Sequence, residues 1–244
     1  MKKVRKVSIV LFLIIFIYGC IQLEQNMNAG EIDMTSSDID LTTSDGVNIK
    51  ATYYKGNSSN GIVLLHMLSR TRKDWEPFAN ELQGKGYNVI SIDLRGHGQS
   101  NLNWQSFNSR DFNNMIEDVR ASKDFLNAKG ARVIAIIGAS VGANVALNYA
   151  ATDSEIKTVI MLSPGLDYRG VKTNETIRNF NGPTLLVTSS EDLYSVESAS
   201  KLHKLSVSKD TKLETYDNAG HGTEMLKEKK LPTLIFNWLS KHLK

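Results

Sequence analysis

Hydrophobic and polar residues alternate in two short runs, 39–43 and 47–54, on either side of a Ser-Asp-Gly segment. Alternation with a period of two is typical of strands that bury one face, and Asp-Gly favours a tight turn. The two runs therefore predict an antiparallel hairpin at the start of the folded body.

After this hairpin the pattern changes to short apolar runs separated by stretches of helical spacing. Continuous apolar runs are typical of strands that are buried on both faces. Strands are expected at 62–65, 87–92, 133–137, 158–162, 184–188 and 212–216. Helices are expected at 75–82, 112–126, 143–151, 196–205 and 231–239. This alternation predicts an α/β fold with a mostly parallel sheet of about eight strands and helices on both faces.

One strand-to-helix turn carries the sequence Gly-Ala-Ser-Val-Gly, at residues 138–142. An apolar strand pattern precedes it, and an Ala-rich helical pattern follows it. A serine between two glycines at such a turn is typical of a nucleophile elbow, because the glycines let strand and helix pass closely while the tight turn presents the serine. The alternative is an ordinary turn in which Ser140 only caps the helix.

Three residues suited to nucleophilic catalysis follow the ends of predicted strands: Ser140, Asp192 and His221. Ligands of parallel sheets bind at this edge. Serine needs a neighbouring base, histidine titrates near neutral pH, and aspartate orients the imidazole. Glu191 and Asp167 are alternative acids. Asp192 is preferred because Glu191 should point the other way and Asp167 follows an earlier strand.

With two further motifs, these stretches resemble the α/β-hydrolase superfamily from about residue 39 to the end of the chain, especially its serine esterases, lipases and acyl-peptide hydrolases. The matching segments are 64–67 (Leu-Leu-His-Met), 93–100 (Asp-Leu-Arg-Gly-His-Gly-Gln-Ser), 138–142, 191–192 (Glu-Asp) and 220–222 (Gly-His-Gly). The resemblance implies the α/β-hydrolase fold, with Ser140, Asp192 and His221 as a triad in the chain order of that family.

The resemblance also implies an oxyanion hole formed by the backbone N–H groups of Val141 and Met67. The family usually has glycine after the histidine, where this chain has Met67. Its flexible side chain is expected to narrow or line the acyl pocket. His66 is expected to orient this loop at the edge of the pocket rather than to react.

Many members of the family carry a cap inserted after the strand predicted here at 158–162. The segment 163–183 leaves only about 20 residues, with one helix expected at 174–180, so little or no cap domain is expected. The predicted substrate pocket comprises His66, Leu68, Trp104, Leu166 and Tyr194. For its aromatic residues the alternative is ordinary packing. A small apolar pocket with a polar entrance predicts short- to medium-chain carboxylic esters.

Residues 1–20 have the pattern of a targeting segment. Basic residues precede an apolar run at 7–18, which is short for a membrane span of about 20 residues. The run ends in Gly-Cys, which resembles the lipobox of prokaryotic lipoproteins and implies that Cys20 is lipidated. The alternative is an uncleaved anchor helix. In both cases the protein is expected outside the cytoplasm and anchored at a membrane, with 21–37 as a tether and 38–244 as the hydrolase domain.

Composition narrows the choice of function. Four of the 29 basic residues lie in the first six positions, so the rest of the chain nearly balances its 26 acidic residues and offers no basic surface for nucleic acid. The single cysteine excludes an intramolecular disulfide. The spacings typical of metal sites and of dinucleotide-binding loops are missing from the sequence, so no metal and no cofactor is expected.

These observations predict a serine carboxylic ester hydrolase that works through an acyl-enzyme. Two alternatives stay open: a peptidase or thioesterase with the same triad, and a catalytically silent binding protein on the same fold. The presence of all three triad residues argues against the silent protein. The sequence leaves the physiological ester and the oligomeric state open.

Overall fold

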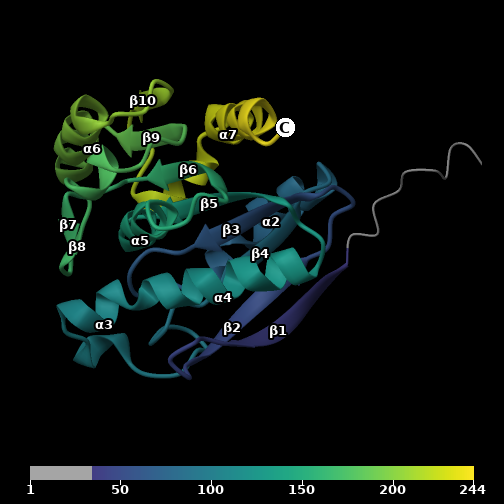
Figure 1. Ribbon diagram of the computed structural model, residues 1–244. Helices are drawn as coiled ribbons and strands as arrows, with labels where there is room; N and C mark the ends of the chain where they lie inside the picture. The colour runs from purple at the N-terminus through teal and green to yellow at the C-terminus, as the bar shows by residue number, and fades with distance from the viewer. Residues whose placement is uncertain (1–34) are drawn as a thin grey trace, which may run out of the picture. The chain divides into compact units, whose positions relative to one another are not determined.

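An eight-stranded sheet organises residues 35–244, which are the residues that this computed structural model describes (Figure 1). The predicted targeting segment, Cys20 and most of the predicted tether lie outside these residues. Within residues 35–244, no helix has the length and apolar character needed to cross a membrane.

The strands follow the order β1-β2-β4-β3-β5-β6-β9-β10 across the sheet. They are β1 (Ser36–Thr42), β2 (Asn48–Tyr54), β3 (Asn60–Leu65), β4 (Asn88–Ile92), β5 (Val133–Ala139), β6 (Ile156–Leu162), β9 (Thr184–Ser189) and β10 (Thr211–Tyr216). β2 is antiparallel to both of its neighbours, and all the other neighbours are parallel. The predicted α/β sheet is confirmed, and the carboxyl ends of its parallel strands meet at one edge.

The predicted hairpin is present and longer than expected. Ser36 lies opposite Tyr54 and Thr42 lies opposite Asn48, so β1 pairs with the whole of β2. β1 therefore begins inside the segment that the sequence had assigned to the tether. Backbone pairing along a complete partner strand explains the difference, because it orders residues whose polar side chains carry no signal of burial.

Helices cover both faces of the sheet (Figure 1). α2 (Glu76–Gly84) and α7 (Lys230–His242) pack on one face, and α4 (Met115–Ala128), α5 (Val141–Ala150) and α6 (Leu193–Leu205) pack on the other. The side chains of β3 alternate between these two layers: Ile62 joins the core under α7, whereas Val63 joins the core under α4. Burial on both faces explains why β3 is apolar at successive positions.

The long helix expected at 112–126 is two helices, α3 (Ser109–Asn113) and α4. Asn108 caps α3 through a capping box with Asp111, and Asn114 ends it. Asn113 donates a side-chain bond to the Gly170 carbonyl (3.1 Å), outside the helix. Asparagine side chains that bond to backbone groups compete with helical hydrogen bonds, which accounts for the break.

A small hairpin follows β6 in place of a cap domain. Its strands are β7 (Asp167–Tyr168) and β8 (Val171–Lys172), and Figure 1 shows it next to α6, on the side of α3. The helix expected at 174–180 is only a single 3₁₀ turn, Thr176–Arg178. Two-residue strands are too short to produce a sequence pattern, so the hairpin was not predicted.

Candidate active site

Ser140 occupies a strained turn between β5 and α5, with φ of 54°. A positive φ is unusual for a residue that is not glycine, and such strain is typical of functional sites. Added to Gly142, a Cβ atom would lie 2.5 Å from the His66 carbonyl oxygen, and one added to Gly138 would meet the Gly142 carbonyl. Both glycines are therefore required for the close passage of strand and helix, as the elbow pattern predicted.

His221 and Asp192 are joined by a hydrogen bond, with 2.6 Å between His221 Nδ1 and Asp192 Oδ2. Asp192 also caps α6, accepting a bond from the Ser195 N–H (3.4 Å). Burial raises the pKa of Asp192, but hydrogen bonds from Ser195 and His221 outweigh it and hold that pKa below the usual range. The carboxylate is therefore ionised at neutral pH and able to orient the imidazole.

The residues that flank Ser140 and His221 are in contact. A Cβ atom on Gly222 would lie 3.3 Å from Ala139 Cβ, so the histidine loop packs against the elbow. Among residues 35–244, no hydrogen bond joins Ser140 and His221 directly. Catalytic hydrogen bonds are often long or poorly aligned in a free enzyme and tighten with substrate. The structure thus brings the three predicted residues to one place and joins two of them by a hydrogen bond.

The loop that carries His221 is held by residues that the sequence had not assigned to this task. Glu191 accepts a bond from the Gly220 N–H (2.7 Å), and Glu224 accepts one from the His221 N–H (3.3 Å). Ser163 Oγ accepts a bond from the Gly222 N–H (2.9 Å). Glu191, the alternative acid, thus contacts the backbone of the histidine loop instead of the imidazole. Ser163 has a positive φ (49°), which is unusual for a residue that is not glycine. This backbone conformation is visible only in the structure.

His66 is fully buried between the loop after β3 and the loop after β4. The Leu94 N–H donates to His66 Nε2 (3.0 Å), so the ring proton lies on Nδ1 and bonds to the Met67 carbonyl (2.8 Å). Burial and the neighbouring His97 lower the pKa of His66 to about 4, so the ring stays neutral. His66 orients the predicted oxyanion loop, as expected, but its assignment to the substrate pocket is wrong because none of its surface is exposed.

The two predicted oxyanion donors are Met67 N–H and Val141 N–H. Among the described residues neither donates a hydrogen bond to another part of the chain. Val141 is the first residue of α5, where N–H groups have no partner within the helix. Unpaired N–H groups are what an oxyanion hole requires, and the loop of Met67 passes close to Gly142, because a Cβ atom there would meet the His66 carbonyl.

The Met67 side chain lies beside the loop that carries His221. It is only 8% exposed and joins the core under α2 and α7, against Gly222. The expectation that Met67 narrows or lines the acyl pocket stays a prediction. The long, flexible methionine side chain reaches the apolar core under α2 and α7, which lies next to the loop that carries His221.

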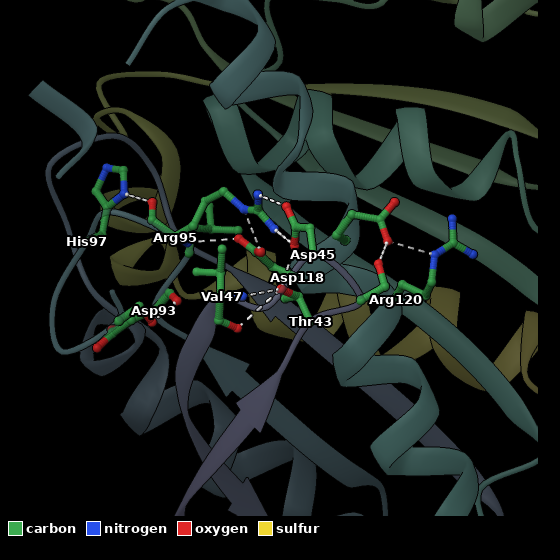
Figure 2. A network of polar contacts seen from close by, with 12 residues as sticks. Thr43, Asp45, Val47, Asp93, Arg95, His97, Asp118 and Arg120 are labelled. Carbon is green, nitrogen blue, oxygen red and sulfur yellow. Dashed lines mark hydrogen bonds and ion pairs between the residues drawn. The ribbon is translucent and has the colours of Figure 1, made fainter. Parts of the chain in front are cut away.

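Arg95 anchors the loop after β4 in a buried polar network (Figure 2). Its guanidinium binds Asp45 with two bonds (2.7 and 3.0 Å) and Asp118 with one (2.8 Å), and its N–H also binds Asp118 (2.8 Å). Burial raises the pKa of Asp118 to about 7, against the lowering effect of Arg95. The network ties this loop to the β1–β2 turn and to α4.

Asp93 links the loop after β4 to Arg72, which follows the predicted oxyanion loop after β3. Its carboxylate accepts bonds from the Arg72 N–H (2.7 Å), the Arg72 guanidinium (2.5 Å) and the Gln99 N–H (2.9 Å). A Cβ atom on Gly98 would collide with this carboxylate, so glycine is needed there. The motif 93–100, which carried part of the resemblance, thus acts as a scaffold for residues 66–72.

The other predicted pocket residues lie in two groups. Leu68 and Trp104 are partly buried against the core of the α4 face, and Trp104 stacks on His97 with ring centroids 5.5 Å apart. Leu166 directly precedes the small hairpin, and Tyr194 lies in the first turn of α6, where its hydroxyl bonds to the backbone of Asp167 in the hairpin. Within residues 35–244, no cluster of three or more histidine, cysteine or acidic residues is suited to a metal.

Known proteins share this sequence pattern and this fold. The family model described as "Serine aminopeptidase, S33" matches residues 56–175. The AB hydrolase superfamily protein YisY of Bacillus subtilis is 33% identical over 104 residues, which cover 42% of this chain and 37% of that protein. The match to this curated relative thus spans little more than a third of its length.

Two solved structures illustrate the likeness of the fold. The Pyrococcus furiosus esterase PF2001 superposes with a TM-score of 0.76 at 18% identity, covering 88% of this chain and 93% of that one. A dienelactone hydrolase from Anabaena variabilis gives a TM-score of 0.71 at 20% identity, covering 86% and 99%. The chain therefore has the α/β-hydrolase fold, and its residues 56–175 match a family of serine aminopeptidases in sequence.

Proposed function

We propose that this protein is a serine hydrolase of carboxylic esters in which Ser140 is the nucleophile, His221 the base and Asp192 the acid. One observation carries the proposal: the strained Ser140 elbow packs against the loop of His221, whose imidazole is bonded to Asp192. These are the parts that an acyl-transfer triad needs.

The proposed reaction has two halves. Ser140 Oγ forms a bond to the ester carbonyl carbon while its proton passes to His221 Nε2, and the resulting imidazolium is stabilised by Asp192. His221 then gives that proton to the leaving alcohol as the carbon–oxygen bond of the ester breaks. Water, activated by the same imidazole, attacks the acyl-enzyme, and the carboxylic acid leaves with Ser140 protonated again.

The N–H groups of Met67 and Val141 support this chemistry because both are unpaired and Val141 directly follows the nucleophile. In the tetrahedral intermediate they would stabilise the negative oxygen. The loss of one such donor typically slows a reaction by about a hundred- to a thousandfold. His66 contributes by holding the Met67 carbonyl, which lies in the peptide that follows the one carrying the Met67 N–H.

The small hairpin favours compact esters over large substrates bound beneath a lid. It consists only of β7 and β8, which form a separate two-stranded sheet, and Tyr168 in it and Leu166 just before it are partly buried. An esterase among the superposed structures supports the same substrate class. The aminopeptidase name of the matching family model makes an amide the natural competing substrate to test.

The test is a burst assay with p-nitrophenyl acetate and butyrate, beside the matching anilides and thioesters. The wild type should release a burst of p-nitrophenol and then turn over. The variant Ser140→Ala should lose on the order of 10⁴-fold or more in kcat/KM. The control Ser106→Ala, at an exposed serine, should keep wild-type rates.

Two results would contradict the proposal. A wild type with neither burst nor turnover on the whole ester panel would leave the silent binding protein as the better reading. A faster reaction with anilides or thioesters than with esters of the same acyl group would favour a peptidase or a thioesterase.

For its location we propose a membrane anchor outside the cytoplasm, supported by the apolar run and Cys20 of the sequence. The intact mass of protein extracted from membranes tests this. A mature chain that begins at Cys20 with added acyl mass is expected. An unmodified full-length mass would favour the uncleaved anchor helix instead.

A further inference from the structure

Asp74 connects the two loops that carry proposed catalytic groups. It lies in the 3₁₀ turn Arg72–Trp75, directly after the proposed oxyanion loop, which comprises residues 66–72. Its Oδ2 atom accepts a hydrogen bond from the Thr223 hydroxyl (3.2 Å), and Thr223 is the second residue after His221. The two partners are 149 residues apart in the sequence, so only the folded chain brings these loops together.

The same carboxylate oxygen also binds the oxyanion loop. Asp74 Oδ2 accepts a bond from Arg70 Nε (2.7 Å), and the Arg70 N–H donates to the Met67 carbonyl (3.2 Å). A carboxylate oxygen has two lone pairs, so one oxygen is able to accept from both Arg70 and Thr223. A continuous series of hydrogen bonds therefore runs from the histidine loop through Asp74 to Met67, whose N–H is a proposed oxyanion donor.

This polar contact between the loops is largely shielded from water. Thr223 is 7% exposed, and the side chain of Asp74 is 17% exposed. Beside them the Met67 sulfur packs against Gly222, where an added Cβ atom would lie 2.8 Å from it. A flexible methionine side chain tolerates displacement of its neighbours, whereas a hydrogen bond constrains both distance and direction. The polar contact is therefore the better candidate for fixing the two loops relative to each other.

We propose that Asp74 is a positioning residue that holds the base His221 and the oxyanion donor Met67 N–H at a fixed separation. Both groups act on one substrate in the same transition state: the imidazole takes the proton of Ser140 while the N–H stabilises the new negative oxygen. A displacement of one loop relative to the other therefore lowers kcat and leaves KM nearly unchanged. This inference rests on the proposed function, because it assigns a task within the same site.

Three variants separate this hydrogen bond from other roles of the two residues. Thr223→Val keeps the size of the side chain and removes the hydroxyl that donates to Asp74. Asp74→Ala removes the acceptor, and with it the bond from Arg70. Asp74→Asn removes the negative charge but keeps an amide oxygen that can replace Oδ2 as the acceptor of both bonds.

Thr158→Val is the matched control. It also removes a buried threonine hydroxyl, which donates to the Pro183 carbonyl (2.7 Å). Thr158 lies near the start of β6, whereas the proposed site lies at the carboxyl ends of the strands. The control therefore costs a buried hydrogen bond without touching either loop.

The experiment measures kcat and KM for p-nitrophenyl butyrate in the full-length protein, and the second-order rate at which a fluorophosphonate labels Ser140. In the labelling reaction Ser140 Oγ bonds to phosphorus, fluoride leaves, and His221 takes the proton, so the natural ester need not be known. The circular dichroism spectrum of each variant is first compared with that of the wild type, and its melting temperature is recorded.

Thr223→Val and Asp74→Ala are each expected to lower kcat and the labelling rate by about tenfold, with a change in KM of less than about twofold. The double variant should be within about twofold of Asp74→Ala, because both changes remove the same bond. Asp74→Asn should come within about threefold of the wild type. Thr158→Val should lower the melting temperature but keep both rates within about twofold.

Additive losses in the double variant, a loss below about threefold in Thr223→Val, or an Asp74→Asn variant as slow as Asp74→Ala would overturn the inference. An equal loss in Thr158→Val would do so too, since the rates would then follow stability rather than the contact between the loops. Thr223→Val and Asp74→Asn decide the question by themselves if Asp74→Ala does not fold. A failure of the proposed function is distinct, because the wild type itself would then be neither labelled nor active.

Discussion

Two adjacent acidic residues just after β9, Glu191 and Asp192, bind different parts of the loop that carries His221. Asp192 binds the imidazole of His221, and Glu191 binds the Gly220 N–H (2.7 Å) and Ser189 Oγ (2.5 Å). These hydrogen bonds hold the pKa of Glu191 below its usual range. Successive side chains at a strand end point in different directions, so neighbours of the same chemistry acquire different partners.

Replacing Glu191 by Ala should free the histidine loop without removing a triad residue. We expect kcat/KM for p-nitrophenyl butyrate to fall by about tenfold, because His221 is then less well placed. Glu191→Gln, whose amide oxygen still accepts the Gly220 bond, should recover most of the loss. An unchanged rate in Glu191→Ala, or a loss as large in Glu197→Ala on the exposed face of α6, would contradict this role.

At the scale of elements, the small hairpin is held in place by polar side chains of three helices. Asn144 of α5 donates to the Val171 carbonyl (2.8 Å) and accepts from the Gly165 N–H (3.1 Å), and both bonds are buried. Asn113 of α3 and Tyr194 of α6 hold the two ends at Gly170 and Asp167. Hydrogen bonds rather than a large apolar face therefore position Tyr168.

Asn144→Leu keeps the size of the side chain but leaves two buried backbone groups unpaired. We expect it to lower the free energy of unfolding by about 2–4 kcal/mol, because buried polar groups without partners are costly. Urea denaturation followed by circular dichroism measures the change. Asn113→Ala, whose bonds are more exposed, should cost less, and a reversed order of the two variants would contradict the argument.

At the scale of the whole molecule, Arg95 joins parts that are distant in sequence: the turn after β1, the loop after β4, and α4. The same loop holds the proposed oxyanion loop after β3 through Asp93 and Arg72. A fixed oxyanion hole needs such support, because a small displacement of its donors weakens the binding of the transition state. The stability of this side of the fold and the geometry of the site therefore depend on the same ion pairs.

The network should make the fold sensitive to acid. Hydrogen bonds from Arg95 lower the pKa of Asp45 from 3.8 to about 2. The carboxyl therefore stabilises the fold above pH 3.8, and this contribution is lost as the pH falls toward 2. Melting temperatures of wild type and Asp45→Asn from pH 7 to 2 test this. The difference should be largest near neutral pH and narrow below pH 4, and a constant difference would contradict it.

Much of the site was predictable because it depends on local patterns. Ser140 follows an apolar strand and lies between glycines, and Asp192 and His221 follow strand ends, so parallel packing alone brings them to one edge. The places of Met67 and His66 were not predictable. Both depend on which layer of the fold lies next to their loop, and a sequence pattern carries no such information.

The sequence by itself determined the order and type of the main elements, the edge at which chemistry could occur, and the residues able to perform it, because periodicity and glycine positions act over short distances. Only the tertiary structure decided that Glu191 contacts the histidine loop, that Arg95 ties two loops to α4, and that Asp74 reaches Thr223. Those contacts join residues far apart along the chain, and they exist only once the sheet has placed its strand ends side by side.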